Sequence, residues 1–242
     1  MSMALFTLGN AIVAKASLGR AHARRRNFSH RTHMGVMTSS TTLQNPADRL
    51  QSVCLFCGSS DSADPAYLQA AADFGRACAD EGVRLVYGGG GVGLMGAAAK
   101  AAHAAGGQVL GVMPAFLRQR ELLFDEVETV VVRNMHERKQ LMFEQSDAFA
   151  VFPGGIGTLE EVVELISWRR LNLHAKPIVF LNQGGFWEPF FELIGHTVRE
   201  RLTPTWIGDT WGAAGRADEV LPIIRSLLKH TPDETGEVAA RA

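Results

Sequence analysis

The hydrophobic positions of this chain fall into two kinds of segment that alternate along its length. Short apolar runs, several of them rich in β-branched residues, predict buried strands. Between these runs, apolar residues recur at helical spacing, as in the segment that starts at Leu159. The predicted strands are Val53–Cys57, Arg84–Tyr87, Gln108–Met113, Val127–Val132, Ala148–Phe152 and Pro177–Leu181. The predicted helices cover 65–81, an alanine-rich segment that ends at 105, 135–146, 159–171, 187–202 and 218–229.

Strands and helices that alternate in this way build a parallel sheet with helices on both faces. We therefore expect the α/β class, with a doubly wound parallel sheet in a Rossmann-like three-layer sandwich. Such sheets bind ligands at the carboxyl ends of their strands. The glycine-rich turns of this chain follow predicted strand ends, so we expect them to gather along one edge of the sheet.

Composition divides the chain into a body and two ends. Of the 242 residues, 46% are hydrophobic and 20% are charged, which is ordinary for a globular protein, and we expect 48–230 to form a single nucleotide-binding Rossmann-like domain. Residues 1–47 carry six cations and no acid, so we expect a disordered basic extension. It is either an organelle transit peptide or a stretch upstream of a misassigned start. We expect 231–242 to be a flexible tail.

Charge and apolar patterns argue against two classes of partner. Residues 48–242 carry 18 cations and 25 acids, whereas nucleic-acid binding needs a basic face. No apolar run approaches the roughly 18 residues of a membrane helix, so we expect no membrane partner. Cys54 and Cys57 have a C-x-x-C spacing, but residues three apart on a strand face opposite sides. We interpret the cysteines as small buried hydrophobes of a cytoplasmic protein and predict no metal site.

The segment Pro153–Glu161 carries the strongest functional signal. Its glycines lie between a predicted strand and a predicted helix, where free backbone N–H groups and the helix dipole favour a phosphate. Glu161 would then lie beside whatever the phosphate carries. The alternative is a capping box, in which Thr158 and Glu161 satisfy each other's end of the helix. Three glycines favour the phosphate, because a cap does not need them.

A second glycine-rich turn contains Gly88, Gly90 and Gly93 in the pattern G-x-G-x-x-G. This pattern also occurs in dinucleotide-binding proteins, which place an acid at the end of the next strand. Here that strand ends at Met113-Pro114, without an acid. We therefore interpret the turn as a close backbone approach to a phosphate or ribose, or as a tight turn that serves only packing.

The segment Met135–Lys139 begins a predicted helix with Asn134 as its N-cap. His136 is either a general base or a surface residue. Arg138 and Lys139 lie near a helix start, where cations are unfavourable unless an anion is bound. The alternative is an ordinary solvated charged face.

Four motifs together resemble the Lonely Guy family of cytokinin riboside 5′-monophosphate phosphoribohydrolases, over roughly 52–202 of this chain. The motifs are Phe56-Cys57-Gly58-Ser59-Ser60, Gly88–Gly96, Met135–Lys139 and Pro153–Glu161. The resemblance implies a homodimer or larger assembly with sites near the subunit interface, and a reaction without metal or organic cofactor. Some relatives carry a lysine decarboxylase label, which no residue pattern here supports.

The resemblance also implies residue roles. Arg138 and Glu161 match the catalytic arginine and glutamate of the family, and Lys139 and Glu121 match substrate-contacting positions. We predict that substrate also contacts Gly58, Ser59, Ser60, Gly90, Gly91, Gly154, Gly155, Ile156, Gly157 and Thr158. Ile156 stands where plant members usually have tyrosine, and Leu122-Leu123-Phe124 replaces a more polar stretch, so the base preference can differ.

The resulting hypothesis is hydrolysis of the N-glycosidic bond of an adenine-type nucleoside 5′-monophosphate, either a cytokinin riboside or AMP. The glycine turn would hold the phosphate, and Glu161 would stabilise the positive charge that builds on the ribose. Arg138 would keep Glu161 ionised, because a nearby cation lowers the pKa of a carboxyl group. The alternative is a non-catalytic protein that resembles molybdenum-cofactor carriers.

Overall fold

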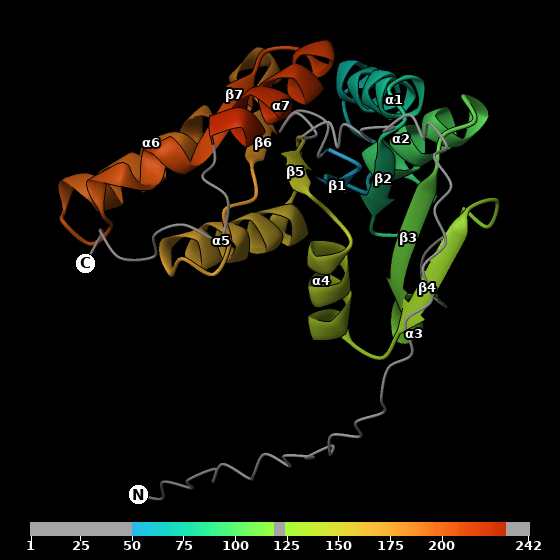
Figure 1. The fold of residues 1–242 in the computed structure, drawn as a ribbon, viewed down its shortest axis with the longest axis horizontal. Coiled ribbons are helices and arrows are strands. Elements are labelled where there is room, and N and C mark those ends of the chain that lie inside the picture. The colour runs from blue at the N-terminus through green and yellow to red at the C-terminus, as the bar shows by residue number, and fades with distance from the viewer. Residues whose placement is uncertain (1–49, 119–123, 231–242) are drawn as a thin grey trace, which may run out of the picture. The chain divides into compact units, whose positions relative to one another are not determined.

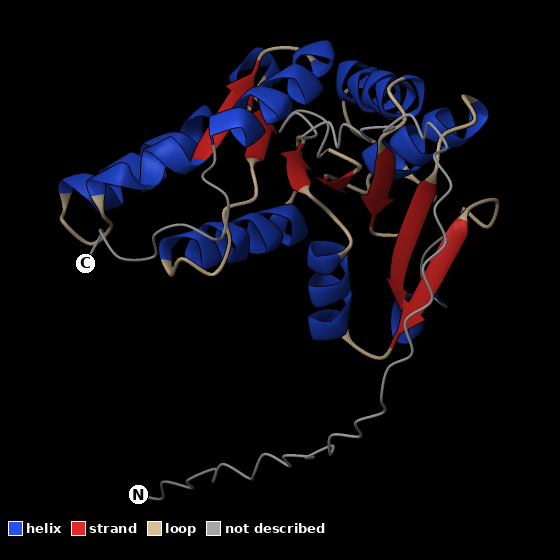
Figure 2. Ribbon diagram, viewed as in Figure 1, coloured by secondary structure: helices blue, strands red, loops and turns tan. Residues whose placement is uncertain are grey.

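The computed structural model describes residues 50–118 and 124–230, which form one seven-stranded sheet with helices around it (Figures 1 and 2). The strands are β1 (Ser52–Phe56), β2 (Arg84–Tyr87), β3 (Val109–Pro114), β4 (Glu128–Val132), β5 (Ala148–Val151), β6 (Ile178–Leu181) and β7 (Trp211–Ala214). The helices are α1 (Pro65–Asp80), α2 (Gly93–Ala104), α3 (Ala115–Arg118), α4 (Met135–Glu144), α5 (Ile156–Arg170), α6 (Glu188–Arg199) and α7 (Val220–His230). Within these ranges, no helix is both long and apolar enough to cross a membrane.

All neighbouring strands pair in parallel, in the order β4-β3-β2-β1-β5-β6-β7. The predicted doubly wound α/β sheet is therefore confirmed. Strands β1 to β4 lie next to one another in chain order on one side of the sheet. Strand β5 then pairs with the other edge of β1, and β6 and β7 follow it. Ligands of such sheets bind where the winding reverses, at the carboxyl ends of the strands. Here that point lies between β1 and β5, directly before α5.

Side chains of the strands alternate between two apolar layers. Val53 and Leu55 pack with α1, α2 and α7, whereas Cys54 and Phe56 pack with α4, α5 and α6. Figure 1 shows α1, α2 and α7 on one side of the sheet and α4 and α5 on the other. Cys57 belongs to the first layer, so the expectation that Cys54 and Cys57 face opposite sides is confirmed. Both thiols are free and buried, and burial raises the pKa of each.

The structure corrects the sequence predictions in three places. Helix α5 begins at Ile156 and not at Leu159, so the last part of the glycine segment is already helical. The short helix α3 and the edge strand β7 were not predicted. Strand β7 has the sequence Trp-Gly-Ala-Ala, which contains no β-branched residue and only one large apolar side chain, so its apolar signal is weak.

Candidate active site

The amino end of α5 leaves backbone donors free at the point where the winding reverses. Gly155 is the N-cap, and its carbonyl accepts the first helical hydrogen bond from Leu159 N at 3.0 Å. The N–H groups of Ile156, Gly157 and Thr158 belong to the first turn and have no acceptor inside the helix. No acceptor elsewhere in the described ranges takes them either. An anion placed here would receive hydrogen bonds and the favourable end of the helix dipole.

Two glycines at this helix start have no steric reason within the described chain. A Cβ atom on Gly155 or Gly157 would meet no heavy atom within 4 Å, and neither residue has a positive φ. Gly155 is the N-cap, where glycine is common, but Gly157 lies inside the helix, where glycine costs up to about 1 kcal/mol relative to alanine. Because no contact within the described residues requires Gly157, it is best explained by a ligand that approaches the backbone closely.

The capping-box interpretation of this segment is wrong. Thr158 is the third residue of α5 and lies inside the helix, and the N-cap is Gly155, which has no side chain. The Thr158 side chain is 3% exposed and packs against Gly154, where an added Cβ would lie 2.2 Å from Thr158 Oγ1. Gly154 is therefore required by internal packing, in contrast to Gly155 and Gly157.

The second glycine turn is filled by the protein itself. At the amino end of α2, Gly93 N donates to Asp61 Oδ1 at 2.7 Å, and Leu94 N donates to Gly58 O at 3.1 Å. Gly93 has φ +60°, and its added Cβ would lie 2.4 Å from the carbonyl carbon of Ser59. These contacts favour the packing interpretation of Gly93. The Asp61 carboxylate also occupies the place that the phosphates of a dinucleotide would need. The sequence analysis did not predict this contact, because Asp61 lies outside the glycine pattern.

The predicted contacts at Gly90 and Gly91 remain predictions. Both residues are buried, and the carbonyl of Gly91 accepts a hydrogen bond from Lys100 Nζ at 2.8 Å. Ser59 and Ser60 are exposed beside them.

Gly58 joins the two turns at the reversal of the winding. Its N–H donates to Pro153 O at 3.0 Å, and its carbonyl accepts the bond from α2 described above. The predicted gathering of glycine-rich turns along one sheet edge is thereby confirmed for β1, β2 and β5. Glu121 and the neighbouring Leu122 and Leu123 lie outside the described residues.

Arg138 is anchored beneath this edge. It lies in the first turn of α4, whose N-cap side chain, Asn134, accepts from Glu137 N as predicted. The Arg138 side chain is buried, with Nε donating to Val112 O and Nη2 donating to Gly88 O, both at 3.2 Å. A Cβ on Gly88 would lie 2.1 Å from Arg138 Nη2, so this glycine makes room for the guanidinium group. His136, by contrast, is exposed.

Glu161 lies in the second turn of α5 and is partly buried. Within the described residues, its side chain makes no hydrogen bond or ion pair. Burial raises the pKa of its carboxyl group to about 7, the Arg138 and Lys139 cations oppose this rise, and Glu160 and Glu164 add to it. Arg138 lowers this pKa as expected, but burial outweighs the cation, so the carboxyl group is not fully ionised at neutral pH. A carboxyl group that titrates near neutral pH suits acid–base chemistry.

Lys139 contacts α5. Its Nζ lies 2.5 Å from Glu160 Oε1 and 2.9 Å from Glu164 Oε2. Within the described ranges, no three His, Cys, Asp or Glu side chains are grouped so that they could hold a metal ion.

Free amides at the start of α5, one turn before a partly buried carboxyl group, define an α/β protein with a candidate anion-binding site at the edge of its sheet. In comparison with known proteins, a family described as "possible lysine decarboxylase" matches 95–224. A probable cytokinin riboside 5′-monophosphate phosphoribohydrolase of Oryza sativa subsp. japonica is 44% identical over 155 residues, covering 64% of this chain and 63% of the relative. An Arabidopsis thaliana cytokinin riboside 5′-monophosphate phosphoribohydrolase is 38% identical over 192 residues, covering 79% and 87%. The chain belongs to this family of phosphoribohydrolases, the Lonely Guy family.

Solved structures with the same fold include proteins named for the molybdenum cofactor. The carrier protein from Chlamydomonas reinhardtii superposes with a TM-score of 0.58 at 23% identity, covering 74% of this chain and 99% of that one. The molybdenum cofactor binding protein of Rippkaea orientalis gives a TM-score of 0.56 at 23% identity, covering 74% and 98%. At this identity the likeness establishes the fold alone.

Proposed function

We propose that this protein hydrolyses the N-glycosidic bond of an adenine-type nucleoside 5′-monophosphate, giving free base and ribose 5-phosphate. The relatives named above are phosphoribohydrolases, which supports the reaction class. The match spans 63% of the rice relative and 87% of the Arabidopsis relative. The observation that carries the proposal is the open amino end of α5, with the unexplained Gly157, one turn before Glu161.

In the proposed reaction, the N–H groups of Ile156, Gly157 and Thr158 bind the 5′-phosphate and so fix the ribose. The bond between C1′ and the base nitrogen breaks with both electrons leaving on the base. A water oxygen bonds to C1′, Glu161 accepts a proton from this water, and a proton is returned to the base. The Glu161 carboxylate also stabilises the positive charge that develops on the ribose in the transition state.

Arg138 supplies a fixed cation at the sheet edge. Two of its nitrogens donate to carbonyl groups of β3 and of the turn after β2, so its position does not depend on substrate. Its charge lowers the pKa of Glu161 against the effect of burial, which keeps a usable fraction of Glu161 ionised near pH 7. The carrier alternative has no need of such a pair, and the likeness to molybdenum-cofactor carriers extends to the fold alone.

The test is base release from AMP by the wild-type protein and by Gly157→Ala. The added methyl group meets no atom of the free protein, so the variant should fold at least as stably as wild type. In the proposed complex the phosphate occupies this open space and would meet the methyl group, so we expect kcat/KM for AMP to fall at least about tenfold, on the scale of a charged hydrogen bond lost. Gly195→Ala on α6 is the matched control, because its nearest neighbour is the end of the Arg199 side chain at 3.4 Å.

Equal rates of wild type on AMP and on adenosine would contradict the role of the α5 amino end. Release of no base from a panel of nucleoside 5′-monophosphates would contradict the proposed function as a whole. Comparing adenine with N6-substituted adenine in that panel would identify the preferred base.

We also propose that the protein is a homodimer or larger assembly. Ile156 and Val163 lie seven residues apart on one face of α5 and are 82% and 48% exposed. Large apolar side chains so exposed beside a site favour burial against a second copy. Light scattering coupled to gel filtration should give at least twice the mass of one chain, and Val163→Glu should lower it. A monomeric wild type would contradict this.

A further inference from the structure

Lys139 links two helices that each carry one member of the proposed catalytic pair. Lys139 is a residue of α4, and the two carboxylates that its ammonium group contacts belong to Glu160 and Glu164 of α5. The Lys139 side chain is 14% exposed and that of Glu164 is 29% exposed, so this pair is screened by solvent less than a surface ion pair. We call these three residues the Lys139 bridge.

The residues of the Lys139 bridge are sequence neighbours of Arg138 and Glu161. Arg138 immediately precedes the lysine on α4, and Glu161 lies between the two bridging acids on α5. The Arg138 side chain donates to Val112 O in β3 and to Gly88 O directly after β2, so α4 is fixed to the sheet on that side. The bridge fixes α4 to α5 on the other.

The two helices do not pack continuously against each other. A small hollow beside Glu161 is lined by Lys139 and Phe143 of α4 and by Glu164 and Trp168 of α5, among others. The rings of Phe143 and Trp168 meet edge-on with centroids 5.2 Å apart. Near Glu161, the spacing of the helices therefore depends on the ion pairs as well as on apolar contacts.

We propose that the Lys139 bridge positions α4 against α5 and thereby sets the separation and the electrostatic environment of Arg138 and Glu161. This inference rests on the proposed function. It gives Lys139 a positioning role in place of the substrate contact that the family resemblance implies. An ammonium group has three donors, and two of them are already used by carboxylates here.

The bridge also bears on the titration of Glu161, which is surrounded by several charged or titratable groups. These are Arg138 and Lys139 on α4, Glu160 and Glu164 on α5, and the thiols Cys54 and Cys57 at β1. Loss of the lysine charge should raise the pKa of Glu161, and loss of the Glu164 charge should lower it. An ion pair too far from Glu161 to act on its charge predicts no such opposite shifts.

The experiment compares Lys139→Met, Lys139→Arg and Glu164→Gln with wild type. For each, kcat and KM for AMP are measured from pH 5 to pH 9, and folding is checked by thermal unfolding. We expect Lys139→Met to lower kcat about 10- to 100-fold with little change in KM, because the pair is displaced while the phosphate site is kept. Lys139→Arg should retain most of kcat. The acidic limb of the pH profile should move up in Lys139→Met and down in Glu164→Gln.

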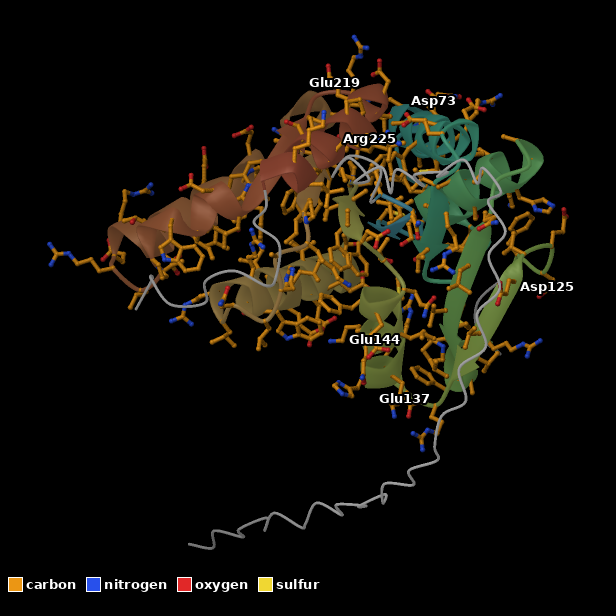
Figure 3. All side chains as sticks on the ribbon, viewed as in Figure 1. Asp73, Asp125, Glu137, Glu144, Glu219 and Arg225 are labelled. Atoms are coloured by element: carbon orange, nitrogen blue, oxygen red, sulfur yellow. The ribbon has the colours of Figure 1, made fainter. Side chains whose placement is uncertain are left out.

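Arg225→Gln is the matched control, because Arg225 also forms an interhelical ion pair, with Glu81, and Figure 3 shows it on α7, away from α4. We expect it to leave kcat and the pH profile unchanged. A rise in KM at constant kcat in Lys139→Met would make Lys139 a substrate contact and overturn the proposal. Unchanged kinetics in Lys139→Met would also overturn it. So would acidic limbs of the pH profile that move in the same direction in Lys139→Met and Glu164→Gln.

Failure of the bridge can be separated from failure of the proposed function. If wild type releases no base, the function fails, and the bridge is then tested by the carboxyl ¹³C titration of Glu161 in the unliganded protein. The Glu161 resonance is identified by its absence in Glu161→Gln. Opposite pKa shifts in Lys139→Met and Glu164→Gln support the bridge, and an unshifted resonance overturns it.

Discussion

Glu161 should destabilise the folded protein at the pH where it works. Burial raises the pKa of its carboxyl group from 4.5 to about 7, so the folded state retains a proton that the unfolded chain has lost. Between these two pH values the unfolded state binds fewer protons, and stability therefore falls as pH rises. The difference of about 2.5 pKa units corresponds to about 3 kcal/mol, which is absent well below pH 4.5 and complete above about pH 7.

Glu161→Gln isolates this effect, because glutamine keeps the shape of the side chain and cannot ionise. Urea unfolding at pH 5 and pH 8 should show that the wild type loses about 2–3 kcal/mol relative to the variant between these pH values. At pH 8 the variant should be the more stable protein, although its kcat for AMP falls about 100-fold or more. Glu192→Gln, at an exposed position of α6, controls for the loss of a surface charge.

One result would refute this reasoning. If wild type and Glu161→Gln change stability equally between pH 5 and pH 8, the Glu161 carboxyl group is not in a desolvating environment. An undiminished kcat in the same variant would remove Glu161 from the reaction.

Three further predictions follow from other contacts. The value of kcat/KM for AMP should rise with pH through about 7 as Glu161 ionises, and a flat profile from pH 5 to pH 8 would contradict this. Gly88→Ala places a methyl group 2.1 Å from Arg138 Nη2, so steady-state kinetics should show kcat lowered about 100-fold, and a rate near wild type would contradict the need for space there. His174 Nε2 donates to Leu165 O, and burial lowers the pKa of its imidazole from 6.5. The unfolded chain then binds more protons below pH 6.5, so stability should fall as pH drops, and unfolding of His174→Gln should lack this component.

The sheet and most helices could be predicted because their signal is local. Apolar runs such as Ala148–Phe152 and the helical spacing within 135–146 leave little choice of structure. The start of α5 could not, because Gly155 and Gly157 are poor helix formers and the pattern T-x-x-E resembles an N-cap. A helix begins there nonetheless, since β5 ends at the reversal of the sheet and Thr158 packs against Gly154.

The sequence predicted which residues form the candidate site better than it predicted the contacts that those residues make. The motifs identified Arg138 and Glu161, but the carbonyl groups that hold Arg138 come from β3 and the turn after β2, far away in the sequence. For the same reason the sequence did not reveal that Asp61 fills the amino end of α2. The pKa of Glu161 depends on burial between elements, which no spacing pattern encodes.

The most direct test of the central claim is a crystal structure of Glu161→Gln with AMP bound. We expect the 5′-phosphate to accept hydrogen bonds from the N–H groups of Ile156, Gly157 and Thr158, with residue 161 beside the ribose. A phosphate bound at the amino end of α2, in place of the Asp61 carboxylate, would contradict the account.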